Sequence, residues 1–320
     1  MFDNLSLLFA APILNLQLIL DGIFIGAIFA LAAYGLALVW GVMNVKNLAQ
    51  GDFVIMGGYL AWWLSLDNTI HLSIPFTEIV VIDVIKPGIH PIWGLPIASV
   101  VMFAFGWLVY RLVISRVVGR DLFTSLLATF GLAIFLQQIL NLLFGPEVQA
   151  AESGLESRFL FDGLVTVADI KIVSLVLVGL LASGIVVFMK FSRMGQAIRA
   201  TAQNARAAKV VGINTERVYA FTYALNAAIC GAAGVLVAMI WVIQPYYGLS
   251  HSIRSFVIVT AAGLGNLPGV ITAGLGLGIA EQFSGFVLGA EFQQATVVGL
   301  LLLLLIIRQI QQSRQRQAVV

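Results

Sequence analysis

The sequence predicts an all-α fold, a polytopic membrane helical bundle with about eight or nine transmembrane segments. Of the 320 residues, 60% are hydrophobic and only 10% are charged, and the mean hydropathy is +1.01. A soluble domain carries about 25% charged residues, so this apolar excess requires lipid as a solvent. The apolar residues form runs of membrane-spanning length, and the basic residues gather in alternate connecting segments. The net charge of +2 gives no indication of nucleic acid binding.

Runs of about 20 apolar residues are long enough to cross the hydrocarbon core as helices. The expected spans are residues 16–40, 49–66, 94–115, 122–144, 172–190, 218–243, 253–288 and 292–308. The block 253–288 is too long for one crossing, and Gly263, Pro268 and Gly269 lie inside it. Because these residues break helices, we expect two segments joined by a tight turn, which gives eight or nine segments in total.

Basic residues orient the chain in the membrane. Thirteen of the 17 Lys and Arg residues lie in four segments: Lys46; Arg111, Arg116 and Arg120; six residues between Lys190 and Arg217; and Arg308, Arg314 and Arg316. The connecting segments 66–92 and 145–171 are acidic. The positive-inside rule then places the basic segments in the cytoplasm, and the acidic segments and the N-terminus outside. Residues 244–252 are expected to form an outer loop, followed by three crossings or by one crossing and a re-entrant hairpin.

Small residues recur at four-residue spacing in two of the expected spans. Gly22, Gly26 and Ala30 form one such face, and Gly274 and Gly278 form another. Small faces let helix backbones approach closely in lipid. Both faces therefore predict internal helix packing, with a face that slides or seals during gating as the alternative.

Several chemical functions lack the residues that they need. The dipeptide Gly-Lys of a phosphate-binding loop does not occur, so the chain is not expected to hydrolyse ATP. The three histidines, His71, His90 and His251, are scattered in expected outer loops without metal-ligand spacing, and the G-x-S-x-G motif is absent. Cys230 is expected to be a small packed side chain. The chain is predicted not to be an enzyme and to bind no metal or cofactor.

Residues 1–15 contain no Lys or Arg, so a cleavable signal peptide is not expected.

The most informative connecting segment is the basic loop from Lys190 to Arg217. It carries six positive charges and one negative charge and is rich in alanine, which predicts a helix that ends at Gly212 and Asn214. Such a helix could simply contact anionic lipid. However, the run RAAKVVG at 206–212 resembles the E-A-A-x-x-x-G coupling motif of ABC importer permeases, with Arg206 where Glu is usual. The resemblance implies an ATPase-coupling role for Asn204, Arg206, Ala207, Ala208, Lys209 and Gly212.

A second resemblance covers the start of the expected second span. Residues 41–59, GVMNVKNLAQGDFVIMGGY, resemble the I-N-F-A-H-G-E-x-x-M-x-G-A-Y signature of branched-chain amino acid permeases of the LivH type. Gln50 stands where His is usual, and Asp52 replaces Glu. Residues 192–218 and 263–281 also resemble this family, so that the resemblance covers nearly the whole chain. The Gln- and Arg-rich tail after Arg308 departs from the usual R-P-x-G-L-F-G end.

The resemblance implies an ABC importer permease, with a single transmembrane permease domain over residues 1–320 and a cytoplasmic coupling loop at 190–217. It implies a second permease subunit, expected to be a different chain, two ABC ATPase subunits that use ATP, and an extracytoplasmic substrate-binding protein. The expected location is the plasma (inner) membrane of a bacterium. Branched-chain or other neutral amino acids are the expected substrates, with urea or short amides as the alternative. An ion-coupled secondary carrier is a further alternative. Such a carrier would normally place ionisable relay groups at the centre of the membrane, and only Glu281 is a fair candidate for that role.

Polar side chains inside the spans are costly in lipid and usually face the protein interior. The candidates for the substrate pathway are Asn47, Gln50, Gln137, Asn226, Thr260 and Glu281, with Gln138, Asn141 and Gln244 as further polar positions. Interhelical hydrogen bonding is the alternative for each of them. Asp52 is expected to cap a helix start or to pair with Lys46. Arg254 is expected to anchor the outer interface or to attract a substrate carboxylate.

Overall fold

Helices form most of the chain. The structure is a computed structural model and describes residues 2–66, 68–73, 80–86, 88–160, 165–263 and 266–317. The α-helices are α1 (Phe2–Ala10), α2 (Pro12–Met43), α3 (Gln50–Ser65), α4 (Gly94–Leu112), α5 (Leu122–Phe144), α6 (Asp169–Phe191), α7 (Arg193–Gln203), α8 (Ala205–Val210), α9 (Thr215–Ile240), α10 (Gly248–Ala262), α11 (Leu267–Leu288) and α12 (Gln293–Gln317). The short 3-10 helices are η1 (Pro91–Trp93), η2 (Ile114–Arg116), η3 (Pro245–Tyr247) and η4 (Ala290–Phe292).

Polar side chains fix the points at which several helices begin. The carboxylate of Asp121 accepts the backbone N–H of Thr124 at 3.0 Å at the start of α5. Asn214 and Asn266 cap α9 and α11 in the same way. Each cap satisfies an N–H group that has no partner inside its helix. Hydrogen bonds from the Thr124 side chain and backbone also hold the pKa of Asp121 below its usual value.

Seven helical segments among the described residues are long and apolar enough to cross a membrane. They are Pro12–Met43, Pro91–Arg116, Phe123–Phe144, Asp169–Phe191, Thr215–Ile240, Leu267–Leu288 and Ala290–Ile307. Two further helices, α3 with 16 residues and α10 with 15 residues, occupy expected spans but are shorter. The long block 253–288 is divided between α10 and α11, as its glycines and proline predict. The number of actual crossings, expected to be eight or nine, stays a prediction.

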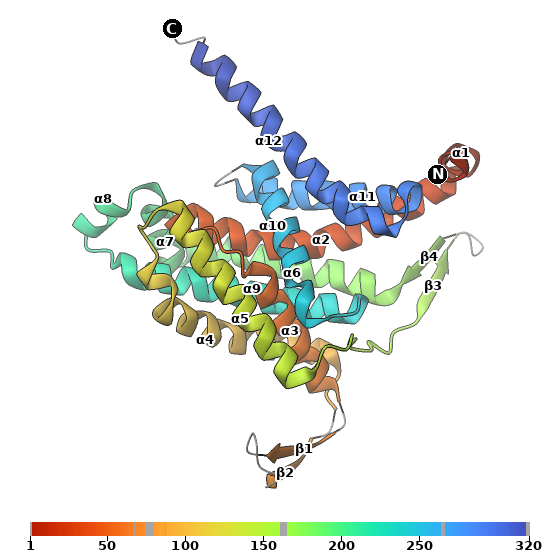
Figure 1. The fold of residues 1–320 in the computed structure, drawn as a ribbon, viewed down its shortest axis with the longest axis horizontal. Coiled ribbons are helices and arrows are strands. Elements are labelled where there is room, and N and C mark those ends of the chain that lie inside the picture. Colours follow the sequence, from red (N-terminus) through yellow and green to blue (C-terminus); the bar gives the residue numbers. More distant parts are fainter. Residues whose placement is uncertain are drawn as a thin grey trace.

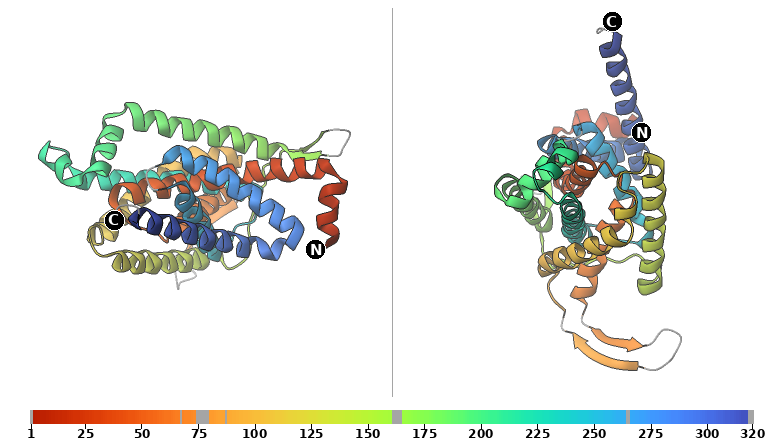
Figure 2. Two further views of the ribbon diagram at one scale, coloured as in Figure 1. Left: turned by 90° about the horizontal axis from the view of Figure 1, so that it is seen from above. Right: turned by 90° about the vertical axis from the view of Figure 1, so that its left-hand side faces the viewer.

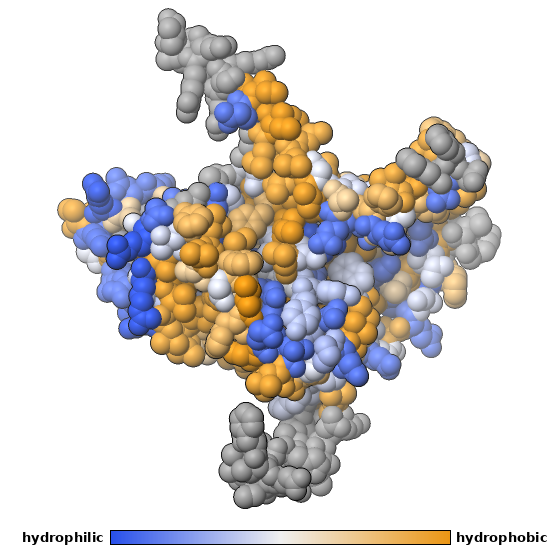
Figure 3. Space-filling view, viewed as in Figure 1, coloured by the Kyte–Doolittle hydropathy of each residue, from blue (hydrophilic) through white to orange (hydrophobic). Residues whose placement is uncertain are grey.

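The core of the bundle is built on α2 and α9. In the most apolar stretch of α2, 94% of the residues are buried, and in that of α9, 83% are buried. The share is 17% for α6 and 6% for the segment Ala290–Ile307, which holds the first part of α12. The helices α2, α6 and α9 run along the long axis of the molecule, and α3 and α10 cross them (Figures 1 and 2). In Figure 3, hydrophobic side chains cover much of the visible face, and hydrophilic ones gather at the end that carries α7 and α8. This distribution is that of a protein surrounded by lipid.

The two small-residue faces pack against each other. A Cβ atom added at Gly22 would lie 2.5 Å from Cα of Ile279, and one added at Gly274 would lie 2.5 Å from Cβ of Ala30. Gly278 faces the backbone of Gly22 and Gly26. The sequence prediction of close packing is therefore confirmed, and it joins α2 to α11. No side chain larger than hydrogen fits at these positions unless the helices move apart.

Two antiparallel hairpins extend from the helical bundle. Strands β1 (Asn68–Ser73) and β2 (Val80–Lys86) form one, and β3 (Ser157–Leu160) and β4 (Val165–Ala168) form the other. The amide of Gln17 on α2 makes two hydrogen bonds with the backbone of Thr166, at 2.9 and 3.0 Å. Asp21 on the same helix forms an ion pair with Lys171 at 2.6 Å. These contacts fix the second hairpin to the end of α2.

Two expectations about connecting segments are wrong. The expected outer loop 244–252 is a loop only in its first part, because α10 already begins at Gly248, and His251 is therefore helical. The expected single helix of the basic loop is divided into α7 and α8 at Asn204. The side chain of Asn204 accepts the backbone N–H groups of Arg206 and Ala207 at 3.0 Å, and this cap starts a new helix.

Candidate functional site

Helix α3 begins inside the bundle rather than at its surface. The Gln50 amide nitrogen lies 2.8 Å from the carbonyl oxygen of Ala32 on α2, and 2.9 Å from both Oδ1 of Asn226 and Sγ of Cys230 on α9. Asn226 and Cys230 lie near the middle of α9. With 16 residues, α3 rises about 24 Å, which is less than the roughly 30 Å of a hydrocarbon core. The irregular backbone of residues 44–49 therefore lies at membrane depth, where burial in protein makes it tolerable.

Helix α10 begins at the same depth as α3, and the two starts touch. The hydroxyl of Ser252 accepts the backbone N–H of Gly51 at 2.8 Å and donates to the carbonyl oxygen of Leu48 at 2.7 Å. A Cβ atom added at Gly51 would lie 2.6 Å from the backbone nitrogen of Ser252 and would collide with the carbonyl oxygen of Gly248. From this contact α3 runs beside α9, where Gly57 faces Gly231. The N-terminal ends of two short helices thus meet within the membrane.

Three of the predicted pathway residues form one buried amide cluster. The side chains of Asn47, Gln50 and Asn226 have no exposed surface. Asn47 donates to Oε1 of Gln50 at 3.4 Å, and Gln50 in turn contacts Asn226. Gly35 makes room for this cluster, because a Cβ atom there would collide with Oδ1 of Asn226. These amides bond to one another and to α2, which is the interhelical role that was the alternative for each of them.

The side chain of Gln137 contacts Asp52 rather than the amide cluster. Its side-chain nitrogen, on α5, donates to Oδ1 of Asp52 at 2.9 Å. Asp52 is fully buried in the first turn of α3. It does not pair with Lys46, whose ammonium lies over the ring of Trp40 at 4.8 Å. The second oxygen, Oδ2, has no hydrogen-bond partner among the described residues.

Glu281 is joined to Arg254 in a largely buried ion pair. Their side chains are 2.8 Å apart, and the guanidinium also lies 4.9 Å from the ring centroid of Phe29. The ring of Phe29 stacks on Trp241 and meets His251 edge-on. The pair links α10 to α11, and it neutralises the charge of Arg254. Arg254 is therefore neither a free interfacial anchor nor a free site for a carboxylate in this structure.

The remaining polar candidates lie apart from these groups. Thr260 is half-buried near the end of α10, two turns beyond Ser252. Gln244 donates to the carbonyl oxygen of Pro146 at 3.2 Å and ties two connecting segments together. Gln138 is exposed on α5, and Asn141 is half-buried with Oδ1 lacking a partner among the described residues. In Figure 3, hydrophilic side chains interrupt the apolar surface around the lower end of α5.

Helix α8 projects from the end of the bundle that the charge pattern predicts to be cytoplasmic (Figure 1). Val210 and Val211 are 87% and 75% exposed, whereas Ala208 is only 3% exposed. The backbone of Gly212 has φ +89°, a left-handed conformation that favours glycine. Ala207 and Lys209 are exposed as well. Together with the two valines they form the outer surface of residues 205–212, which we call the knob. Ala208 is buried, so that of the two alanines in the expected coupling motif only Ala207 lies at the surface.

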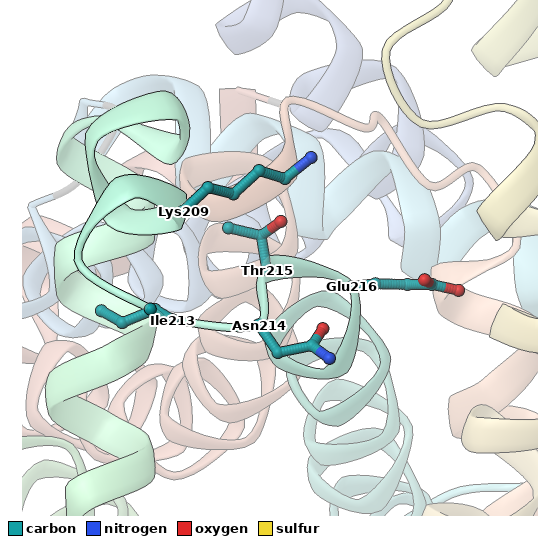
Figure 4. A pocket seen from close by; sticks show the side chains of 6 residues that line it. Lys209, Ile213, Asn214, Thr215 and Glu216 are labelled. Atoms are coloured by element: carbon teal, nitrogen blue, oxygen red, sulfur yellow. The ribbon is translucent and has the colours of Figure 1, made fainter.

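An open pocket lies between α8 and the start of α9. It is lined by Lys209, Gly212, Ile213, Asn214, Thr215 and Glu216. Figure 4 shows the side chains of Lys209 and Glu216 extending toward the same side, with Ile213 on the other. A second pocket next to it shares Asn214 and Glu216 and is completed by residues of α4. The knob is thus flanked by a pocket that carries a positive charge from Lys209 and a negative charge from Glu216.

Several residues at these sites are missed by sequence reasoning. The hydroxyl of Thr129 on α5 contacts the backbone of Lys46 and Leu48 at 3.1 and 3.2 Å, and Ser252 holds Gly51. A hydroxyl inside an apolar run is a weak signal, because it can bond to its own helix, as Thr222 does to Val218 at 2.8 Å. Among the described residues, no group of three or more His, Cys, Asp or Glu side chains could hold a metal ion.

Comparisons with known proteins give one consistent result. The family described as "Branched-chain amino acid transport system / permease component" matches residues 18–307. The chain is 29% identical over 304 residues to the "High-affinity branched-chain amino acid transport system permease protein LivH" of Escherichia coli, covering 91% of this chain and 93% of that one. It is 28% identical over 299 residues to the corresponding protein BraD of Pseudomonas aeruginosa, covering 92% and 94%. No solved structure matches the chain significantly.

Proposed function

The chain belongs to the family of branched-chain amino acid transport permease components, and we propose that it forms half of the membrane pathway of an ABC importer for branched-chain amino acids. The observation that carries this proposal is the family match over residues 18–307, which includes both the α3 start and the α7–α8 loop. The relatives named for branched-chain amino acid transport support the substrate class. Other neutral amino acids of similar shape belong to the same proposal.

ATP hydrolysis is assigned to partner subunits. One of the two ABC ATPase subunits would dock on the exposed knob at α8 and the other on the second permease, and an extracytoplasmic binding protein would deliver the amino acid on the opposite side. A second permease chain, different from this one, would cover the hydrophilic surface around the end of α5 (Figure 3). Polar side chains such as Gln138 on this helix are unfavourable against lipid, and a protein partner or an aqueous path would satisfy them. The proposed location is the plasma (inner) membrane of a bacterium.

Reconstituted transport tests the proposal. The chain is co-expressed with the proposed second permease and two ATPase subunits, purified as a complex and placed in liposomes with ATP inside. Radiolabelled leucine, isoleucine or valine, bound to the partner binding protein, is expected to accumulate only when ATP and all subunits are present. Labelled urea and acetamide are run in parallel.

Three outcomes would contradict the proposal. Uptake that follows an ion gradient without ATP would identify a secondary carrier. Uptake of urea or acetamide without uptake of the amino acids would identify an amide permease. ATP hydrolysis by the isolated chain, free of ATPase subunits, would show that the chain itself is the motor and that the assignment to partner subunits is wrong.

A further inference from the structure

Among the acidic residues that the structure describes in the core of the helical bundle, Asp52 is the one for which no ion pair is seen. Asp21 pairs with Lys171, Asp169 with Arg158, and Glu281 with Arg254. Asp52 has no exposed surface, and its single side-chain bond is the one from Gln137 to Oδ1. A buried carboxylate oxygen without a donor is costly, so Oδ2 requires a partner that the described residues do not supply.

The position of Asp52 suggests what that partner is. Its carboxylate lies against Gly248, the first residue of α10, while Asp52 itself is in the first turn of α3. The residues that precede the two helices, Ala49 and Tyr247, make no side-chain cap, but the N–H of Gly51 in α3 is already bonded to the hydroxyl of Ser252. The start of α10 is therefore the end that can still favour an anion. The start of α10, which suits a carboxylate, thus lies next to Asp52, an acceptor suited to a cation.

A zwitterionic amino acid carries both of these groups on one carbon atom. We infer that Asp52 binds the ammonium group of the transported amino acid through Oδ2, at the level where the N-terminal ends of α3 and α10 meet. The inference rests on the proposed transport function and assigns the residue that recognises the substrate class. Gln137 is a positioning residue, because its hydrogen bond to Oδ1 leaves Oδ2 for the substrate. The substrate carboxylate would meet the start of α10.

Because Asp52 is fully buried, the proposed site is closed in this structure. The seal is the backbone contact of Gly51 with Gly248 and Ser252, which leaves no room for a Cβ atom. Parting this contact requires breaking the two hydrogen bonds of the Ser252 hydroxyl, to Gly51 and to Leu48. Opening by a small separation of α3 and α10 would expose Asp52 to a substrate, and their return would enclose it.

Conservative substitutions of Asp52 test the inference. Asp52→Asn keeps the shape and retains an oxygen that accepts from Gln137, so a purely structural role would survive it, whereas ammonium binding would not. Uptake of leucine by the reconstituted complex is expected to fall about tenfold to a hundredfold, the range for loss of a charged hydrogen-bond partner. Asp52→Glu, which restores the charge, is expected to recover most of the uptake. Asp21→Asn, which removes an ion-paired carboxylate on α2, is the matched control and should transport nearly as the wild type.

Two further readouts separate recognition from structure. In the Asp52→Asn complex, the melting temperature and the stimulation of ATPase activity by the loaded binding protein should both stay near the wild-type values. Wild-type uptake by the Asn variant would overturn the inference. A fall in melting temperature that accompanies the loss of uptake, or equal losses in the Asn and Glu variants, would also overturn it. Failure of the wild-type complex to take up any amino acid would instead reject the proposed function itself.

Discussion

Gln50 connects three helices through one side-chain amide. It bonds to the α2 backbone and to two side chains of α9 from the first residue of α3. Buried amides of this kind pair with one another and with backbone carbonyls of neighbouring helices, and they fix the depth at which a helix starts. The His of the family signature is replaced here by a side chain that can both donate and accept, and the cluster with Asn47 and Asn226 uses both properties.

Replacing Gln50 with Leu should weaken the bundle and reduce uptake while the complex still assembles. The change leaves the carbonyl of Ala32 and the amide of Asn226 without this donor, which costs about 1–3 kcal/mol. A lower melting temperature of the detergent-solubilised complex is the measurement. Gln196→Leu is the matched control, because Gln196 is exposed on α7. Equal melting temperatures for both variants would contradict a structural role for Gln50.

Arg254 and Glu281 should behave as a unit. Arg254→Gln or Glu281→Gln alone leaves an uncompensated buried charge, with an expected cost of about 3–5 kcal/mol. The double variant should regain a large part of that stability, since neither charge is then left alone. Thermal unfolding of the four forms gives the coupling energy as a double-mutant cycle. Additive losses in the double variant would show that the two side chains act independently.

At the scale of elements, the α2–α11 contact depends on which glycine is changed. Gly274 meets Ala30 directly, whereas nothing lies within 4 Å of a Cβ atom at Gly276, two residues further along α11. Gly274→Val should force the helices apart and lower both melting temperature and folded yield. Gly276→Val, with the same change in helix propensity, should have little effect. The reverse order would mean that α11 packs through another face.

The knob at α8 can be tested on its exposed side. Val210→Asp and Val211→Asp place charge on the two most exposed apolar side chains of the loop and should abolish uptake and ATPase co-purification. Gln196→Asp on α7 is the exposed control. Ala208→Trp should also abolish coupling, but by disrupting the packing of α8, and its melting temperature should fall.

A lipid-binding role for the loop predicts a different order. Charge would then matter more than shape, so that neutralising Arg199, Arg206 and Lys209 with Gln would impair uptake more than either valine variant. Unchanged ATPase association in Val210→Asp, combined with that order, would remove the coupling assignment.

At the scale of the whole molecule, charge asymmetry predicts the orientation. A cysteine introduced at Glu152 should react with an impermeant reagent in intact cells, while one at Arg206, or a tag after residue 320, should react only after permeabilisation. The reason is that basic segments are retained in the cytoplasm. A protected Glu152 site with a labelled Arg206 site would invert the topology, and with it the sides assigned to the ATPases and the binding protein.

The sequence by itself determined the membrane class, the approximate positions of the helices and the family. Composition and run length decide these features, because every residue of a span must suit lipid or a helical neighbour regardless of which neighbour it meets. The faces at Gly22, Gly26 and Gly274 were readable for a similar reason: four-residue spacing places small residues on one side of any helix. The division of the block 253–288 followed from local breakers in the same way.

Only the tertiary structure decided the depth at which α3 and α10 begin, the pairing of Arg254 with Glu281, and the burial of Ala208. Each depends on which helix faces meet across long separations in the chain, and polar spacing within one helix carries no information about its partner. Span prediction by hydropathy also treats a short helix that starts at mid-depth like one that starts at the surface, since both are apolar. The unpaired state of Asp52 arises from the same cause: its charge was visible in the sequence, but the absence of a cation among its described neighbours is a property of the packing.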